Sequence, residues 1–206
     1  MVEEVALVFD QLINWLYGVL TKPVQTLNEI AREKPANAAF LIYLGITMLS
    51  VLSSLYNPQA MQAFEDLMRE TDIAIPFSVI IAASLLMAII SIFVVTGVLQ
   101  LLARLFKGNG GYWNLFSAYA FANFPLIIGL PITFISGFLG TVGNILSGVF
   151  SLGLSIWVLV LQVIAVRESH SLSTGASIGV YLLQLAILVG IPLAIAIVLM
   201  IAYLSF

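Results

Sequence analysis

Five long apolar stretches dominate the pattern of hydrophobic and polar positions along the chain. They cover residues 38–56, 75–106, 115–138, 144–166 and 176–204. As a helix, each stretch is long enough to cross the ~30 Å hydrocarbon core of a bilayer. Pro125 and Pro131 lie inside the third stretch and Pro192 lies inside the fifth, where proline kinks a helix. The pattern predicts an all-α integral membrane protein built as a bundle of five transmembrane helices.

The N-terminal region has a different periodicity. Its apolar residues recur at helical spacing, at Val5, Val8, Phe9, Leu12, Trp15, Leu16 and Val19. Because Asp10 and Asn14 interrupt this run, we expect an amphipathic helix lying in the membrane interface rather than a short sixth span. Trp15 and Tyr17 are expected near the lipid headgroups.

A polar segment follows this amphipathic region. Pro23 suits a helix start and Pro35 a helix end, so a second short helix is predicted over residues 24–33. Residues 1–36 are therefore expected to form cytoplasmic or interfacial helices. Residues 37–206 are expected to form the membrane domain.

Composition supports the membrane assignment. The chain is 62% hydrophobic and 8% charged, with a mean hydropathy of +1.14. Soluble domains carry about a quarter charged residues. The net charge of −3 and the single histidine give no basic face for nucleic acid. The chain has no cysteine, which excludes disulfides and thiolate metal sites. We expect no cofactor and no metal.

The basic residues orient the predicted bundle. Six of the seven fall on one side of a five-span topology, at Lys22, Arg32, Lys34, Arg104, Lys107 and Arg167. Arg69 alone falls on the other side, in the acidic segment 57–72, which is predicted to form a short solvated helix. By the positive-inside rule, the N-terminus is cytoplasmic and the C-terminus is outside.

Three amides interrupt the apolar spans, and no ionisable residue lies in the central part of any span. The absence of such residues argues against a proton-coupled transporter or pump. Asn123, Gln162 and Gln184 could line a small cavity, or they could form hydrogen bonds between helices. Both interpretations stay open from the sequence.

One short motif matches a hydrolase signature. Residues 175–179, Gly-Ala-Ser-Ile-Gly, fit the pattern G-x-S-x-G. That pattern needs a strand–turn–helix context, whereas this segment enters a membrane helix. The single histidine, His170, precedes Ser177 by seven residues, which spans ~10 Å in a helix. An intramembrane enzyme is therefore the weakest of the functional hypotheses.

A series of short motifs appears in a fixed order between residues 20 and 200. They include a proline before a short helix, a glycine turn followed by an aromatic residue, and an Ile-Trp pair. Their positions are Pro23, Gly110, Gly111, Tyr112, Tyr119, Pro125, Ile156, Trp157, Leu172 and Ser173. In order and spacing these motifs resemble the Yip1-domain family of five-span membrane proteins. In that family the Ile-Trp pair stands at the start of the fourth span.

The resemblance implies a fold and a membrane location. Eukaryotic members of the family act in early secretory traffic, carry a long cytosolic N-terminal region, and associate with Rab-type GTPases and with one another. This chain has some 35 residues before its first span, and none resembles that region. Binding of a small GTPase is therefore not expected. The compact form is similar to bacterial or archaeal members, which implies a prokaryotic plasma membrane.

The leading hypothesis is a non-enzymatic membrane organiser or adaptor that acts through its cytoplasmic face. Its partners would be the lipid bilayer, another membrane protein or further copies of itself. The alternative is a small transporter or channel for a lipid or solute, because kinked helices are where transporters place their sites. The candidate surface comprises Gly110, Gly111, Tyr112, Tyr119, Pro125, Trp157, Arg167, Glu168, His170 and Ser173.

Within this surface, the bend at residues 107–114 is expected to reverse the chain. Gly108, Gly110 and Gly111 are expected to supply positive φ angles there. Arg167, Glu168 and His170 are expected to be polar contact points. An anchoring role at the headgroups is the alternative for Arg167.

Overall fold

The computed structural model describes residues 2–55, 58–71 and 75–204, and this part of the chain folds into helices with no strand. The helices are α1 (Val2–Thr21), α2 (Pro23–Glu33), α3 (Ala36–Leu55), α4 (Pro58–Thr71), α5 (Phe77–Leu105), α6 (Tyr112–Ala122), α7 (Leu126–Ser136), the short 3₁₀ turn η1 (Gly137–Leu139), α8 (Gly140–His170) and α9 (Thr174–Leu204). The all-α prediction is confirmed.

Within the described residues, five helical segments are long and apolar enough to cross a membrane, as predicted. They are α3, α5, α6 together with α7, α8 and α9. The fourth begins at Gly140 rather than at residue 144, because the glycine-rich link before it is itself helical. The predicted end of the first span, Tyr56, lies outside the described residues.

The third span is broken rather than kinked. Helix α6 ends at Ala122, and α7 begins at Leu126. Asn123 caps the end of α6, and its side-chain Nδ2 donates to the carbonyl oxygen of Tyr119 at 2.7 Å. Pro125, which has no N–H to continue the α6 ladder, is buried in the break. Of the two prolines predicted to kink this span, Pro125 lies in the break, whereas Pro131 lies inside α7.

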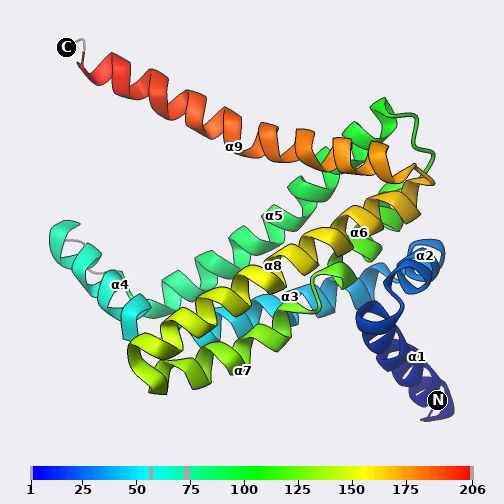
Figure 1. Ribbon diagram of the computed structural model, residues 1–206, viewed down its shortest axis with the longest axis horizontal. Helices are drawn as coiled ribbons and strands as arrows, with labels where there is room; N and C mark the ends of the chain where they lie inside the picture. The colour runs from blue at the N-terminus through cyan, green and yellow to red at the C-terminus, as the bar shows by residue number, and fades with distance from the viewer. Residues whose placement is uncertain (1, 56–57, 72–74, 205–206) are drawn as a thin grey trace.

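Helix α6 forms the centre of the core. Its residues from Leu115 to Ala122 are all buried, and the neighbouring helices α2, α3, α5 and α8 surround it. The other long helices keep large apolar side chains exposed, which is the surface a bilayer would cover. The core therefore lies toward one end of the bundle, around α6 and the helices that meet there (Figure 1).

Helix α1 and the C-terminal half of α9 extend away from this core (Figure 1). The predicted helical character of α1 is confirmed. Trp15 does not lie at an exposed headgroup position, since it is buried against the bundle with its ring edge-to-face on Phe121 at 5.7 Å. Phe9, Ile13 and Tyr17 form an exposed apolar ridge at four-residue spacing. This ridge suits the interfacial placement that the sequence predicts.

Helix α4 lies at the end of the bundle opposite the 107–111 bend (Figure 1). It carries the acidic segment predicted from the sequence, and Arg69 pairs with Glu65 at 3.9 Å and with Asp66 at 4.0 Å along the same helix. These side chains are largely exposed, as expected of a solvated helix. Asn57 and Asp72, at the limits of the predicted segment, lie outside the described residues.

Candidate functional site

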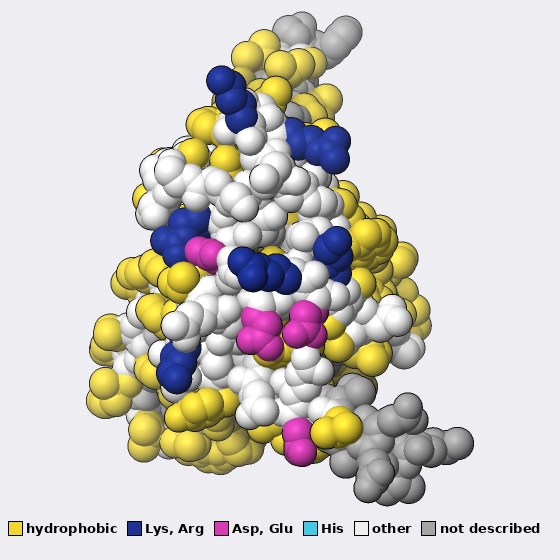
Figure 2. All heavy atoms as spheres, turned by 90° about the vertical axis from the view of Figure 1, so that its right-hand side faces the viewer, with side chains coloured by type: hydrophobic (Ala, Val, Ile, Leu, Met, Phe, Trp, Pro, Cys, Tyr) yellow, Lys and Arg dark blue, Asp and Glu magenta, His cyan; other side chains and the backbone are white. Residues whose placement is uncertain are grey.

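Most of the positive charge gathers at one end of the bundle, here called the basic end. Of the seven Lys and Arg residues, only Arg69 belongs to α4 at the other end. The remaining six lie where α2, the 107–111 bend, the end of α8 and the start of α9 meet (Figure 2). This clustering agrees with the charge asymmetry predicted from the sequence.

The bend between α5 and α6 is shaped by contact with α8. The N–H of Gly108 donates to the carbonyl oxygen of Ala103 at 2.8 Å and closes the end of α5. A Cβ atom at Gly110 would lie 1.9 Å from the carbonyl oxygen of Ser169, and one at Gly108 would lie 2.9 Å from the Cβ atom of His170. The bend can therefore approach α8 only where it lacks side chains.

This geometry corrects the role predicted for the glycines. None of the glycines in the bend has a positive φ angle; the residue that does is Lys107, with φ of 65°. The glycines serve close packing, and the reversal itself is made by a lysine in the left-handed region.

A buried polar network lies beneath the bend. Gln100 of α5 donates from Nε2 to the carbonyl oxygen of Gly110 at 3.0 Å, and its Oε1 lies 2.8 Å from His170 Nε2. The other ring nitrogen of His170, Nδ1, lies 3.0 Å from Ser169 Oγ. His170 is 1% exposed, so it is not the surface contact point that the sequence suggested. It joins α8 to α5 and, through Gln100, to the bend.

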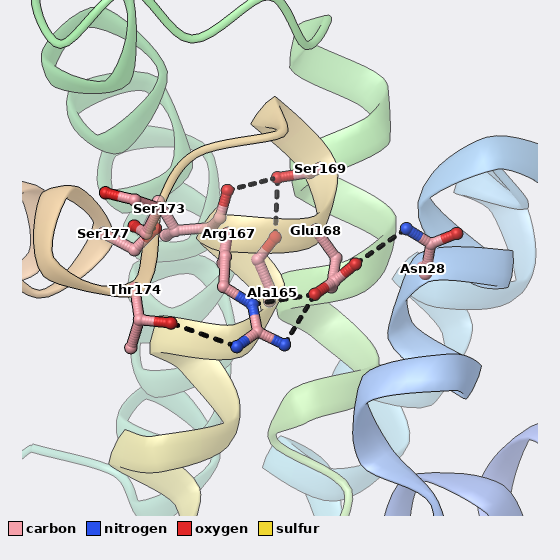
Figure 3. A network of polar contacts seen from close by, with 9 residues as sticks. Asn28, Ala165, Arg167, Glu168, Ser169, Ser173, Thr174 and Ser177 are labelled. Carbon is pink, nitrogen blue, oxygen red and sulfur yellow. Dashed lines mark hydrogen bonds and ion pairs between the residues drawn. The ribbon is translucent and has the colours of Figure 1, made fainter.

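A second network ties α2 and α9 to the end of α8 (Figure 3). Asn28 Nδ2 donates to Glu168 Oε2 at 2.7 Å, across 140 residues of sequence. Arg167 pairs with the other carboxylate oxygen, with Nη2 at 2.7 Å from Glu168 Oε1, and also donates to Thr174 Oγ1 at 3.2 Å. Arg167 and Glu168 therefore join α2, α8 and α9. The sequence predicted Arg167 as a polar contact point or as a headgroup anchor, and neither prediction included this role.

No histidine or carboxylate among the described residues is hydrogen-bonded to the serine of the hydrolase-like motif. Ser177 is buried, and its hydroxyl donates to the carbonyl oxygen of Ser173 at 3.1 Å. Both ring nitrogens of His170 are engaged by Ser169 and Gln100 instead. Ser173 is exposed, and its Oγ accepts a hydrogen bond from the N–H of Ala176 in the first turn of α9. These contacts are those of helix ends.

The membrane amides form a chain of hydrogen bonds. Gln162 of α8 donates from Nε2 to Asn123 Oδ1 at 3.0 Å and accepts the hydroxyl of Tyr181 on α9 at its Oε1. Three helices are thereby joined at a buried point. Gln184 is also buried, but no described residue donates to its Oε1. The structure brings Asn123 and Gln162 together and leaves Gln184 outside the chain.

The remaining predicted site residues lie apart from one another. Tyr112 is half-buried, and its hydroxyl lies 2.9 Å from Thr96 Oγ1 of α5. Tyr119 is buried within α6. Trp157 lies in the middle of α8 rather than at the start of a span, and it is exposed. Tyr119, Pro125 and His170 are thus too buried to form part of a contact surface.

Gly110, Gly111 and Glu168 do come together, in a pocket of about 360 Å³ at the basic end. It is lined by Asn28, Ala31, Arg32, Lys34, Asn109, Gly110, Gly111, Asn114, Glu168, Ser169 and Ser171. Sequence reasoning missed Asn28 and Gln100 as members of the site. A single Gln inside the apolar end of α5 is the signal that could have indicated Gln100.

Among the described residues, no group of three His, Asp or Glu side chains is placed to hold a metal ion.

We compared the sequence with models of known protein families. The model of the Yip1 domain matches residues 17–204. The chain belongs to the Yip1-domain family. The match begins within α1 and runs through α9, so it includes the basic end and all five candidate spans of this Yip1-domain protein. The chain has no significant match among curated proteins or among solved structures. The Yip1 family is not a known enzyme family.

Proposed function

We propose that this Yip1-domain protein is a non-enzymatic membrane organiser or adaptor that works through its basic end. The observation that supports the proposal is the way polar side chains are used there. Asn28, Glu168 and Arg167 bind one another across α2, α8 and α9, and Gln100 and His170 do so beneath the bend. These bonds give a fixed polar platform at the end of an otherwise apolar bundle.

The platform leaves charged groups available to a partner. Arg32, Lys34, Arg104 and Lys107 are exposed and have no ion pair with a described residue. Trp113 is also exposed, in the first turn of α6. Exposed cations near an aromatic residue suit a partner that lies against the membrane. We place this surface, with the N-terminus, in the cytoplasm of a prokaryotic cell, and the C-terminus outside.

The orientation can be tested directly, because the chain has no cysteine. Single cysteines at Lys107 and Arg69 should be labelled by a membrane-impermeant maleimide from opposite sides of the membrane in intact cells. We expect Arg69→Cys to be labelled and Lys107→Cys to be labelled only after permeabilisation. The opposite pattern would place the basic end outside.

The adaptor role can be tested by purifying complexes from native membranes. Arg104→Glu with Lys107→Glu should remove the partner, whereas Arg69→Glu at the opposite end should retain it. Equal retention by both variants, with folding intact, would contradict the role of the basic end. A loss of function on Ser177→Ala would instead favour the enzyme hypothesis.

A transporter remains a second candidate because of one observation, the buried Oε1 of Gln184 that no described residue satisfies. Buried polar atoms without partners are found where water or a solute binds. Flux of a lipid or solute through liposomes containing the purified protein, abolished by Asn123→Leu, would replace the adaptor proposal. Absence of flux would leave the amides with a packing role.

A further inference from the structure

We propose that the pocket between α2, the 107–111 bend and the end of α8 binds the phosphate group of an anionic lipid headgroup. The proposal does not depend on a protein partner, so it can fail while the adaptor function stands. The volume of about 360 Å³ lies at the lower end of small-molecule sites. This size suits a headgroup rather than a whole lipid or a cofactor.

The charge of the pocket favours an anion. Arg32 and Lys34, from the end of α2, line it without an ion pair to any described residue. The acid in the lining, Glu168, is already bound by Arg167 and Asn28. Its negative charge is thus compensated inside the protein, and the two cations from α2 are left for a ligand. Arginine and lysine are the residues that bind phosphate oxygens in proteins.

The pocket is also held in shape before a ligand arrives. The bond from Asn28 to Glu168 fixes α2 against α8 at the wall of the pocket. The bond from Gln100 to the carbonyl oxygen of Gly110 fixes the bend that forms another wall. Lys34 stands in the left-handed region with φ of 55° and ends α2 at the pocket. A preformed site of this kind avoids the entropic penalty of ordering its loops around the ligand.

The position of the pocket selects a lipid as the source of the phosphate. It lies where the helices leave the apolar part of the bundle. Trp113, which precedes the lining residue Asn114 in the chain, is exposed, and tryptophan is a residue type found at the level of the headgroups. Figure 2 shows the Lys and Arg side chains of this end with Asp and Glu side chains and uncharged surface between them. A headgroup approaching from the neighbouring leaflet would reach this surface without leaving the bilayer.

The test compares two double variants of the full-length protein that change charge equally. Arg32→Gln with Lys34→Gln removes the cations of the pocket, and Arg104→Gln with Lys107→Gln removes two cations of the same end that do not line it. All four side chains are exposed, so both proteins should fold, with unchanged thermal unfolding as the check. Binding of dioctanoyl phosphatidylglycerol is measured by titration calorimetry in a neutral detergent at physiological salt.

We expect the pocket variant to bind phosphatidylglycerol at least about tenfold more weakly, since removing each basic residue near an anionic lipid weakens binding by about fivefold. The control variant should change by about twofold or less because of screening by salt. An equal loss in both variants would overturn the proposal by showing attraction to the whole basic end. Inorganic phosphate that binds as tightly as the lipid would overturn the lipid source.

Discussion

The two ends of the bundle use the same kinds of charged residue in different ways. At the basic end, Glu168 is bound by Asn28 from another helix, and Arg167 reaches across to the start of α9. At the other end, Arg69 pairs with acids three and four residues away on α4, and its side chain is 77% exposed. At the basic end the charged side chains therefore join neighbouring helices, whereas on α4 they are exposed to solvent.

This difference matters energetically because of burial. The side chains of Arg167 and Glu168 are 26% and 16% exposed, and His170 is almost fully buried. Polar groups withdrawn from water need their partners, and removing one partner leaves the other unsatisfied. Exposed ion pairs along one helix contribute little, since water replaces them readily. Substitutions at the basic end should therefore be the more destructive.

The largest effect is expected for Gly110→Ala. The new Cβ would lie 1.9 Å from the carbonyl oxygen of Ser169, which is backbone and cannot rotate away. Overpacking of this kind typically destabilises a protein by about 1–3 kcal/mol, and the upper part of that range is expected here. Unfolding followed by tryptophan fluorescence in detergent, in rising amounts of SDS, would measure the loss.

Two matched variants control this experiment. Gly97→Ala lies in α5, where an added Cβ meets nothing within 4 Å, so stability should be unchanged or slightly raised. Gly111→Ala lies in the same bend, but its Cβ would meet the Asn114 side chain, which can move. If Gly110→Ala were as stable as Gly97→Ala, the close approach of the bend to α8 would be wrong.

The second effect concerns the buried pair of Gln100 and His170. Gln100→Leu removes a partner from His170 and from the carbonyl oxygen of Gly110, and should destabilise the fold by about 2 kcal/mol. His170→Phe in the same background should then have a smaller effect than it has alone. A double-mutant cycle from unfolding curves provides the coupling energy. Additive effects would show that the two side chains do not interact.

Sequence reasoning could predict the fold because the signals for it are local. Span length, the proline at residue 125 and the clustering of basic residues are each readable within one segment, and helices in a bilayer must satisfy their backbone internally. The site could not be predicted in the same way. Gln100 and His170 are 70 residues apart, and Asn28 and Glu168 are 140 apart, so their pairing depends on how the helices pack.

The glycine bend shows the same limit at a finer scale. Gly108, Gly110 and Gly111 follow a basic residue at a helix end, a context in which glycine most often provides a positive φ angle. Lys107 takes that conformation instead, and Gly110 is needed because α8 passes close by. A residue type that permits two roles does not reveal which one is used until the neighbouring helix is in place.

The third effect compares the two arginines directly. Arg167→Gln leaves the half-buried carboxylate of Glu168 with Asn28 alone, and about 1.5 kcal/mol of stability should be lost. Arg69→Gln should change stability by about 0.5 kcal/mol or less, because its pairs are exposed. Adding Glu168→Gln to Arg167→Gln should restore part of the loss. Equal losses for both arginines would remove the contrast between the two ends.

The smallest effect concerns the amides within the membrane. Gln162 bonds to Asn123 and Tyr181, whereas no described residue donates to Oε1 of Gln184. Gln162→Leu removes the hydrogen-bond partner of Asn123 Oδ1 and of the Tyr181 hydroxyl. It should lower the free energy of unfolding by about 0.6 kcal/mol, the average for hydrogen bonds between membrane helices. Gln184→Leu should be neutral or slightly stabilising, because it removes a buried oxygen that no described residue satisfies. Unfolding in SDS distinguishes the two. If Gln184→Leu proved the more damaging, the Oε1 of Gln184 would bind a group other than the described side chains, and the cavity hypothesis would gain over packing.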